Sequence, residues 1–133
     1  MSKKLRGWAL MNTMLAIIGT IFLMAIASFK IPEILNDAKE AKAAQLTATV
    51  GSLVSQYKLE IGKYPEKLSD LTKADGQYGP WLKEVPKDPF AGKKDLQYKK
   101  SDKAYAVYSV GKDGSSNSDA DKIGGDDIGF TGN

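Results

Sequence analysis

The chain has 133 residues, and its 19 basic and 16 acidic side chains give a formal net charge of +3. It has no cysteine and no histidine, which excludes disulfides, thiolate zinc sites, cysteine nucleophiles and serine–histidine pairs. Lys3, Lys4 and Arg6 carry three of the positive charges ahead of the first apolar run, so the remainder is neutral and lacks the basic face that nucleic-acid binding requires.

An uncharged, mostly apolar stretch of 23 residues follows, from Gly7 to Phe29. A helix of that length would extend ~34 Å, enough to cross a hydrocarbon core of ~30 Å. The basic residues on its leading edge predict a cytoplasmic N-terminus. The sequence therefore predicts a single membrane-spanning helix.

This stretch supports two interpretations of export. In the first it is an ordinary secretory signal, with a small-residue site at 25–27 and cleavage before Ser28. In the second, a short basic leader is cut between Gly7 and Trp8, and the apolar helix is retained. The stretch taken alone does not distinguish them.

Helical periodicity beyond the membrane segment favours the retained helix. Apolar residues recur at spacings of three and four, as expected for one stripe of an amphipathic helix, at Leu46, Val50, Leu53, Tyr57 and Ile61. Only Pro32 interrupts the pattern, and we expect it to bend the helix rather than end it. Residues 8–61 are therefore predicted to form one helix, which a cleaved signal would not need.

The remainder predicts a small α+β domain. Gly62 and Pro65 end the long helix, and residues 66–72 resemble a short helical turn. A punctuated loop follows over 75–95, then two strands at 96–100 and 104–110 and a glycine- and aspartate-rich tail. The helical stripe should pack on an antiparallel sheet, against either Tyr105, Val107 and Ser109 or the alternate residues. The aromatic residues of the globular part are expected in this core, namely Tyr64, Tyr78, Trp81, Tyr98, Tyr105 and Tyr108. Four carboxylates are expected to be solvated, Glu60, Glu66, Asp70 and Asp75.

Several short motifs, taken in order, resemble a known family. They are KLRG at 4–7, GKYP at 62–65, WLKEVPKDPF at 81–90, YSVGKDG at 108–114 and GDDIG at 125–129. Together they resemble type IV pilins and, more narrowly, the major pseudopilin of type II secretion systems, protein G.

This resemblance implies a structural subunit rather than an enzyme. Residues 1–7 would be a prepilin leader, 8–31 a transmembrane and filament-core helix, and 32–133 a periplasmic globular domain. A prepilin peptidase would cut after Gly7 and methylate the new terminus at Trp8. The partners implied are other pseudopilin subunits and the inner-membrane secretion platform, within a periplasmic filament that helps drive export across the outer membrane.

One position departs from the family in a way that bears on assembly. The family has a glutamate as the fifth residue of the mature chain, paired with a neighbour's amino terminus, where this chain has Asn12. An amide supplies no countercharge for that contact. A minor or terminal subunit, or a subunit of a pilus or another filament system, is therefore an alternative to the major subunit.

The tail holds the one candidate for metal chemistry. Over residues 113–127, five aspartates stand against a single lysine, Lys122: they are Asp113, Asp119, Asp121, Asp126 and Asp127. The pattern fits a solvated acidic tail or a calcium site, because hard cations prefer oxygen ligands, but its spacing is not that of an EF-hand.

The resemblance implies calcium held by Asp113, Asp126 and Asp127, with the carbonyl of Val110. It assigns no role to Asp119 and Asp121, which lie in a connection longer than the family commonly shows. A secreted calcium-binding module and, more weakly, a membrane-anchored hydrolase are the competing functions.

Overall fold

The computed structural model describes the backbone of residues 3–133 and the side chains of residues 6–25 and 32–133. The first two residues of the predicted leader, and the side chains of its next three, lie outside the described residues. The chain forms two compact units, Met1–Asn36 and Asp37–Asn133, which are considered separately below.

The first unit consists of the N-terminal part of helix α1 (Lys3–Ile61). The helix continues through Pro32, in agreement with a single helix predicted over 8–61. Its segment Arg6–Ala25 has a mean hydropathy of 1.8 and is long and apolar enough to cross a membrane. The hydroxyls of Thr13 and Thr20 donate to carbonyls of the preceding turn, so these polar groups are satisfied within the helix.

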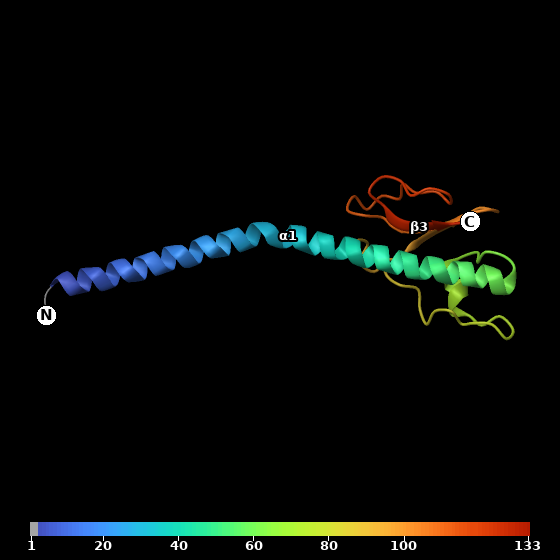
Figure 1. Ribbon diagram of the computed structural model, residues 1–133, viewed down its shortest axis with the longest axis horizontal. Coiled ribbons are helices and arrows are strands. Elements are labelled where there is room, and N and C mark those ends of the chain that lie inside the picture. The colour runs from blue at the N-terminus through green and yellow to red at the C-terminus, as the bar shows by residue number, and fades with distance from the viewer. Residues whose placement is uncertain (1–2) are drawn as a thin grey trace. The chain divides into compact units, whose positions relative to one another are not determined.

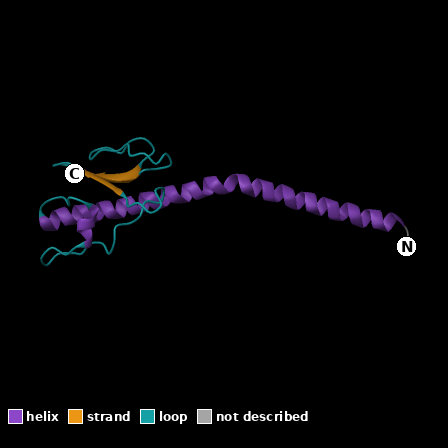
Figure 2. Ribbon diagram, turned by 180° about the vertical axis from the view of Figure 1, so that it is seen from behind, coloured by secondary structure: helices purple, strands orange, loops and turns teal. Residues whose placement is uncertain are grey.

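The second unit combines the C-terminal part of α1 with a small antiparallel sheet, which confirms the predicted α+β class. The sheet has the order β1-β2-β3, with β1 at Gln97–Lys100, β2 at Tyr105–Ser109 and β3 at Ile128–Gly132. A short 3₁₀ helix, η1 (Leu68–Thr72), lies in the turn region predicted at 66–72. Figures 1 and 2 show the strands along one side of the C-terminal half of α1.

Strand β3 corrects the prediction of two strands followed by a tail. It pairs with all five residues of β2, from Tyr105↔Gly132 to Ser109↔Ile128. Its glycines, Gly129 and Gly132, have low strand propensity, so the local sequence gave little sign of it. As the central strand, β2 is buried on both faces, and both alternate sets of its residues lie in the interior.

The buried stripe of α1 is rotated slightly from the predicted one. Val50 and Tyr57 lie in the core as expected, whereas Leu46, Leu53 and Ile61 are only partly buried at its margin. The centre of the stripe is completed by Ala43, Thr47 and Val54. Thr47 is tolerated there because its hydroxyl donates to the Ala43 carbonyl, 2.9 Å away.

Among the aromatic residues predicted in the core, Tyr64, Tyr105 and Tyr108 are buried, and Trp81 and Tyr98 are partly buried. The prediction is wrong for Tyr78, which is exposed in the punctuated loop. Tyr57, Tyr64 and Tyr105 are buried with Leu68, Leu71, Leu96 and Val107. The Tyr105 hydroxyl donates to the Gly51 carbonyl of α1 at 2.6 Å. Gly51 is needed at this crossing, because a Cβ there would lie 2.3 Å from the ring of Phe130 in β3.

Three of the carboxylates expected to be solvated have structural partners, and one of them, the exposed Glu66, forms an ion pair of 2.6 Å with Lys100 of β1. Glu60 accepts a hydrogen bond of 2.7 Å from the indole nitrogen of Trp81. Asp70 accepts hydrogen bonds from the backbone nitrogens of Glu66 and Lys67 at the start of η1. These carboxylates therefore fix the loop after α1.

Candidate metal centre

The site begins where β2 ends, at a point fixed by a buried carboxylate. Asp88 is 1% exposed and accepts three hydrogen bonds, from Ser109 Oγ at 2.5 Å, Phe90 N at 2.8 Å and Val110 N at 3.0 Å. Three donors compensate the burial of its charge. Asp88 therefore holds the first residues of the loop that follows β2.

A glycine then brings the two ends of that loop together. Gly111 has φ 68°, a left-handed conformation that residues with a Cβ rarely adopt. A Cβ at this position would lie 2.2 Å from the backbone oxygen of Asp126. The absence of a side chain at Gly111 thus lets residues 111–113 lie directly against residue 126.

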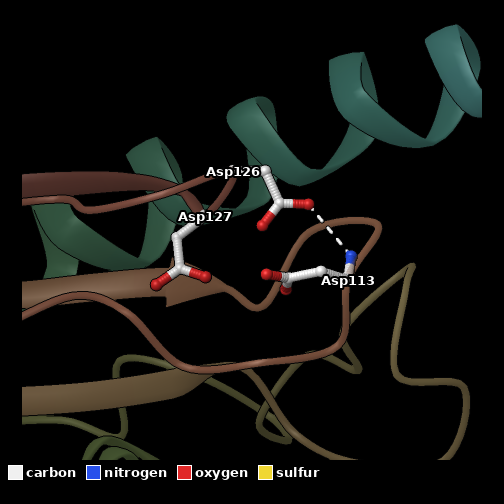
Figure 3. Close-up of side chains that lie close together, drawn as sticks. All are labelled: Asp113, Asp126 and Asp127. Carbon is white, nitrogen blue, oxygen red and sulfur yellow. Dashed lines mark hydrogen bonds between the residues drawn. The ribbon is translucent and has the colours of Figure 1, made fainter.

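Three carboxylates converge at this contact. Asp113, Asp126 and Asp127 each contribute an oxygen, and these oxygens lie within 4.8 Å of one another. Figure 3 shows the three side chains pointing toward a common space. The backbone nitrogen of Asp113 donates to Asp126 Oδ2 at 2.9 Å, and this bond holds the pKa of Asp126 below its ordinary value. Asp126 is therefore ionised down to a lower pH than an ordinary aspartate, and an ionised carboxylate is the form suited to a hard cation.

Asp127 is the buried member of the group, with 8% of its surface exposed. Its Oδ2 accepts hydrogen bonds from Asn117 N at 2.8 Å and Ser118 Oγ at 2.6 Å. Within the described part of the chain, its Oδ1 is buried and has no hydrogen-bond partner. An unpaired anionic oxygen is costly to bury, and a cation bound at this atom would offset that cost.

The arrangement fits a hard cation. Calcium binds oxygen ligands at about 2.3–2.6 Å, so two ligands on opposite sides of one ion are about 5 Å apart, close to the spacing found here. The nearest lysine in the sequence is engaged elsewhere, since Lys112 Nζ lies 2.7 Å from Glu40 of α1 and Glu40 raises the pKa of Lys112. The site can therefore hold a divalent ion through carboxylate oxygens.

Two further aspartates of the tail lie outside the cluster. Asp119 is exposed, accepts a hydrogen bond from Ala120 N, and forms a turn with Lys122 through backbone hydrogen bonds. Asp121 is exposed on the same turn. Val110 is buried at the start of the loop, and a metal contact through its carbonyl remains a prediction.

The structure also shows supporting residues that the sequence did not reveal. Asp88, Asn117 and Ser118 hold the loop and its carboxylates through the hydrogen bonds described above. Serine and asparagine are common in polar loops, so their types gave no signal of this role.

The N-terminal residues singled out from the sequence lie on the exposed surface of the first unit. Trp8 is 74% exposed, and Gly7 and Asn12 are exposed on the same helix. Leader cleavage at Gly7, methylation of Trp8 and the assembly role of Asn12 remain predictions.

Comparison with protein families identifies the class to which these features belong. The family described as Type II secretion system (T2SS), protein G matches residues 30–126, more than two thirds of the chain. The chain therefore belongs to the type II secretion system protein G family, the pseudopilin family indicated by its motifs. Members of this family are structural subunits of the secretion system, and the family is not a known enzyme family. Membership implies interaction with other components of that system.

The matched residues include Asp113 and Asp126 and end one residue before Asp127. The apolar segment Arg6–Ala25 precedes them and fits a single-pass membrane anchor. No curated protein and no solved structure matched the chain.

Proposed function

We propose that this chain is a structural subunit of a type II secretion pseudopilus, a filament that helps drive proteins across the outer membrane. The observation that supports this most directly is the apolar surface of α1. Every large apolar side chain from Trp8 to Met24 is at least 58% exposed within the chain. Such a surface must be covered by lipid or by other protein.

Assembly into a filament would cover this surface in both of its environments. In the membrane the segment lies in lipid, and outside it the apolar helices of neighbouring subunits bury one another at about 25 cal/mol per Å². Head-to-tail contacts between identical subunits form an open helical stack when their rotation does not close a ring. The same helix thus serves as anchor before assembly and as filament core afterwards.

The orientation and processing follow from charge. Lys3, Lys4 and Arg6 would remain on the cytoplasmic side of the inner membrane, which leaves the unit Asp37–Asn133 in the periplasm. A prepilin peptidase would then remove the basic leader between Gly7 and Trp8 and methylate the new amino terminus. Partners would be other pseudopilin subunits and the inner-membrane platform of the secretion system.

Intact mass of the protein purified from membranes tests this function. We expect a chain that has lost residues 1–7 and gained one methyl group at Trp8. Replacing Gly7 in a matched variant should leave the leader attached. A mature chain beginning at Ser28 would instead identify an ordinary secretory signal and contradict the filament proposal.

We also propose that the acidic loop binds one calcium ion through Asp113, Asp126 and Asp127. Two features support calcium: oxygens of the three carboxylates lie within 4.8 Å of one another, and Asp127 has a buried oxygen without a partner among the described residues. The carbonyl of Val110 is the expected backbone ligand. When bound, the ion would offset two of the three clustered negative charges and tie the start of the loop to β3.

A further inference from the structure

The connection between Gly114 and Asp126 has a specific structural role in this chain. We infer that Ser118, in the middle of this connection, is a positioning residue for Asp127. Its hydroxyl fixes one carboxylate oxygen so that the other is left for the cation. This inference rests on the proposed calcium site and assigns a residue that supports it.

The hydrogen bonds around Ser118 are directional. An ionised carboxylate only accepts hydrogen bonds, so the Ser118 hydroxyl donates its proton to Asp127 Oδ2 over 2.6 Å. The same hydroxyl accepts a hydrogen bond of 3.1 Å from Gly124 N. With its proton and one lone pair both engaged, the hydroxyl has a fixed orientation.

Ser118 is itself held firmly in place. It is 3% exposed, and its carbonyl accepts a hydrogen bond of 2.7 Å from Lys99 Nζ of β1. The backbone on its other side lies close to two glycines. A Cβ on Gly124 would lie 2.2 Å from Asn117 O, and Gly125 has a left-handed φ of 62°. The segment 117–118 is therefore clamped between β1 and the chain that leads to Asp126.

This clamping determines which oxygen of Asp127 can bind a cation. Oδ2 accepts two hydrogen bonds, from Ser118 Oγ and Asn117 N, whereas Oδ1 has no partner in the described part of the chain. Figure 3 shows one oxygen of Asp127 directed toward Asp113. Without the Ser118 hydroxyl, Asp127 keeps a single hydrogen bond to Oδ2 and can rotate about its side-chain bonds. Residues that orient a metal ligand in this way typically change metal affinity by about 10–100-fold.

Calorimetric titration of the full-length chain in detergent with calcium chloride tests the role of Ser118. We expect Ser118→Ala to raise the Kd for calcium by about 10–100-fold. Ser118→Thr retains the hydroxyl and should bind within a few-fold of the unaltered chain. Ser115→Ala is the matched control, since Ser115 is exposed and contacts Asp113 through its backbone nitrogen only, and it should leave the Kd unchanged.

A second variant and a second measurement separate positioning from folding. Ser118→Cys keeps the approximate size of the side chain but replaces the hydroxyl with a weaker hydrogen-bond donor, so it should also weaken calcium binding. This variant serves in place of Ser118→Ala if that protein does not fold. A positioning role predicts that the difference in Tm between calcium and chelator narrows in these variants. A purely structural role predicts a lower Tm in chelator with an unchanged Kd, and that result would overturn the inference.

The possible failures are distinguishable. If the unaltered chain binds calcium and Ser118→Ala binds it equally well, the positioning role is wrong and the calcium site stands. If the unaltered chain does not bind calcium, the proposed site fails, and the inference fails with it.

Discussion

Replacing Asp127 with asparagine should make the globular unit more stable without calcium and less stable with it. In the unaltered chain, a buried Asp127 oxygen has no partner within the described residues, and two other carboxylates lie close by. In the Asp127→Asn variant, the amide oxygen can accept the hydrogen bonds of Ser118 and Asn117, and the NH₂ group can donate toward Asp113 or Asp126. Asp127→Asn therefore removes the unpaired negative charge with little change in side-chain volume.

Two magnitudes follow, the stability that Asp127→Asn gains without calcium and the stability that the unaltered protein gains from calcium. An unsatisfied buried polar group costs about 1–3 kcal/mol, so Asp127→Asn should raise the stability of the calcium-free protein by that amount. For a unit of about 100 residues, each kcal/mol shifts Tm by roughly 4–8 °C. Calcium at about 1,000 times its Kd should stabilise the unaltered protein by about 4.1 kcal/mol, more than the variant gains. The variant loses an anionic ligand and should gain little from calcium.

The assay is thermal unfolding of a fragment that begins at Pro32, in chelator and in millimolar calcium. All members of the core cluster lie within Asp37–Asn133, so this fragment retains the whole core. Asp121→Asn is the matched control, because it makes the same charge change on an exposed residue of the same loop outside the cluster. It should leave both melting temperatures nearly unchanged. Magnesium should substitute poorly for calcium, because it requires a tighter octahedral site.

The expected result is a reversal of order, with Asp127→Asn melting above the unaltered fragment in chelator and below it in calcium. Equal calcium shifts in both proteins would show that Asp127 is not a ligand. A variant that melts lower in chelator would show that the unpartnered oxygen is not a source of instability. No calcium effect on the unaltered fragment would leave the acidic loop as a solvated tail.

Three other predictions concern different parts of the chain. Asn12→Glu should give more or longer fibres in electron microscopy of sheared cells, because it restores a charge-assisted contact worth about 1.5–3 kcal/mol; equal assembly would contradict this account. Burial, with a smaller effect of the Glu66 carboxylate, raises the pKa of Tyr98 well above 10.0. The folded protein therefore favours the neutral phenol, and the stability gained from the neutral Tyr98 is complete below pH 10 and is lost as the pH rises through the folded-state pKa. Tyr98→Phe should therefore reduce the alkaline loss of stability in denaturant titrations, while loss of the hydrogen bond to the Pro65 carbonyl costs about 0.5–1.5 kcal/mol at neutral pH; an unchanged pH dependence would refute the assignment. Gly51→Leu should lower stability by about 1–3 kcal/mol in chemical unfolding because it overlaps the ring of Phe130, and Phe130→Ala in the same chain should recover part of the loss.

The sequence alone determined the features that depend on local composition. The membrane segment was predictable because an uncharged apolar run of membrane-spanning length is a local property, and Arg6–Ala25 carries it. Strands β1 and β2 were found because residues 96–100 and 104–110 are bounded by turn residues and rich in strand formers. The short motifs and their order indicated the family, and the resemblance to that family pointed to Asp113, Asp126 and Asp127 as the proposed ligands.

The tertiary structure decided the features that depend on contacts between distant residues. Strand β3 forms because β2 offers a pairing edge, and its own glycines disfavour a strand. Thr47 enters the buried stripe of α1 because its hydroxyl is satisfied within the helix, which a hydrophobic pattern does not detect. Asp113 and Asp126 meet because Gly111 leaves room for a backbone contact and adopts a left-handed φ. Ser118 acquires its role only through this closure, since a hydroxyl in a polar loop has no fixed partner until the fold brings Asp127 within 2.6 Å.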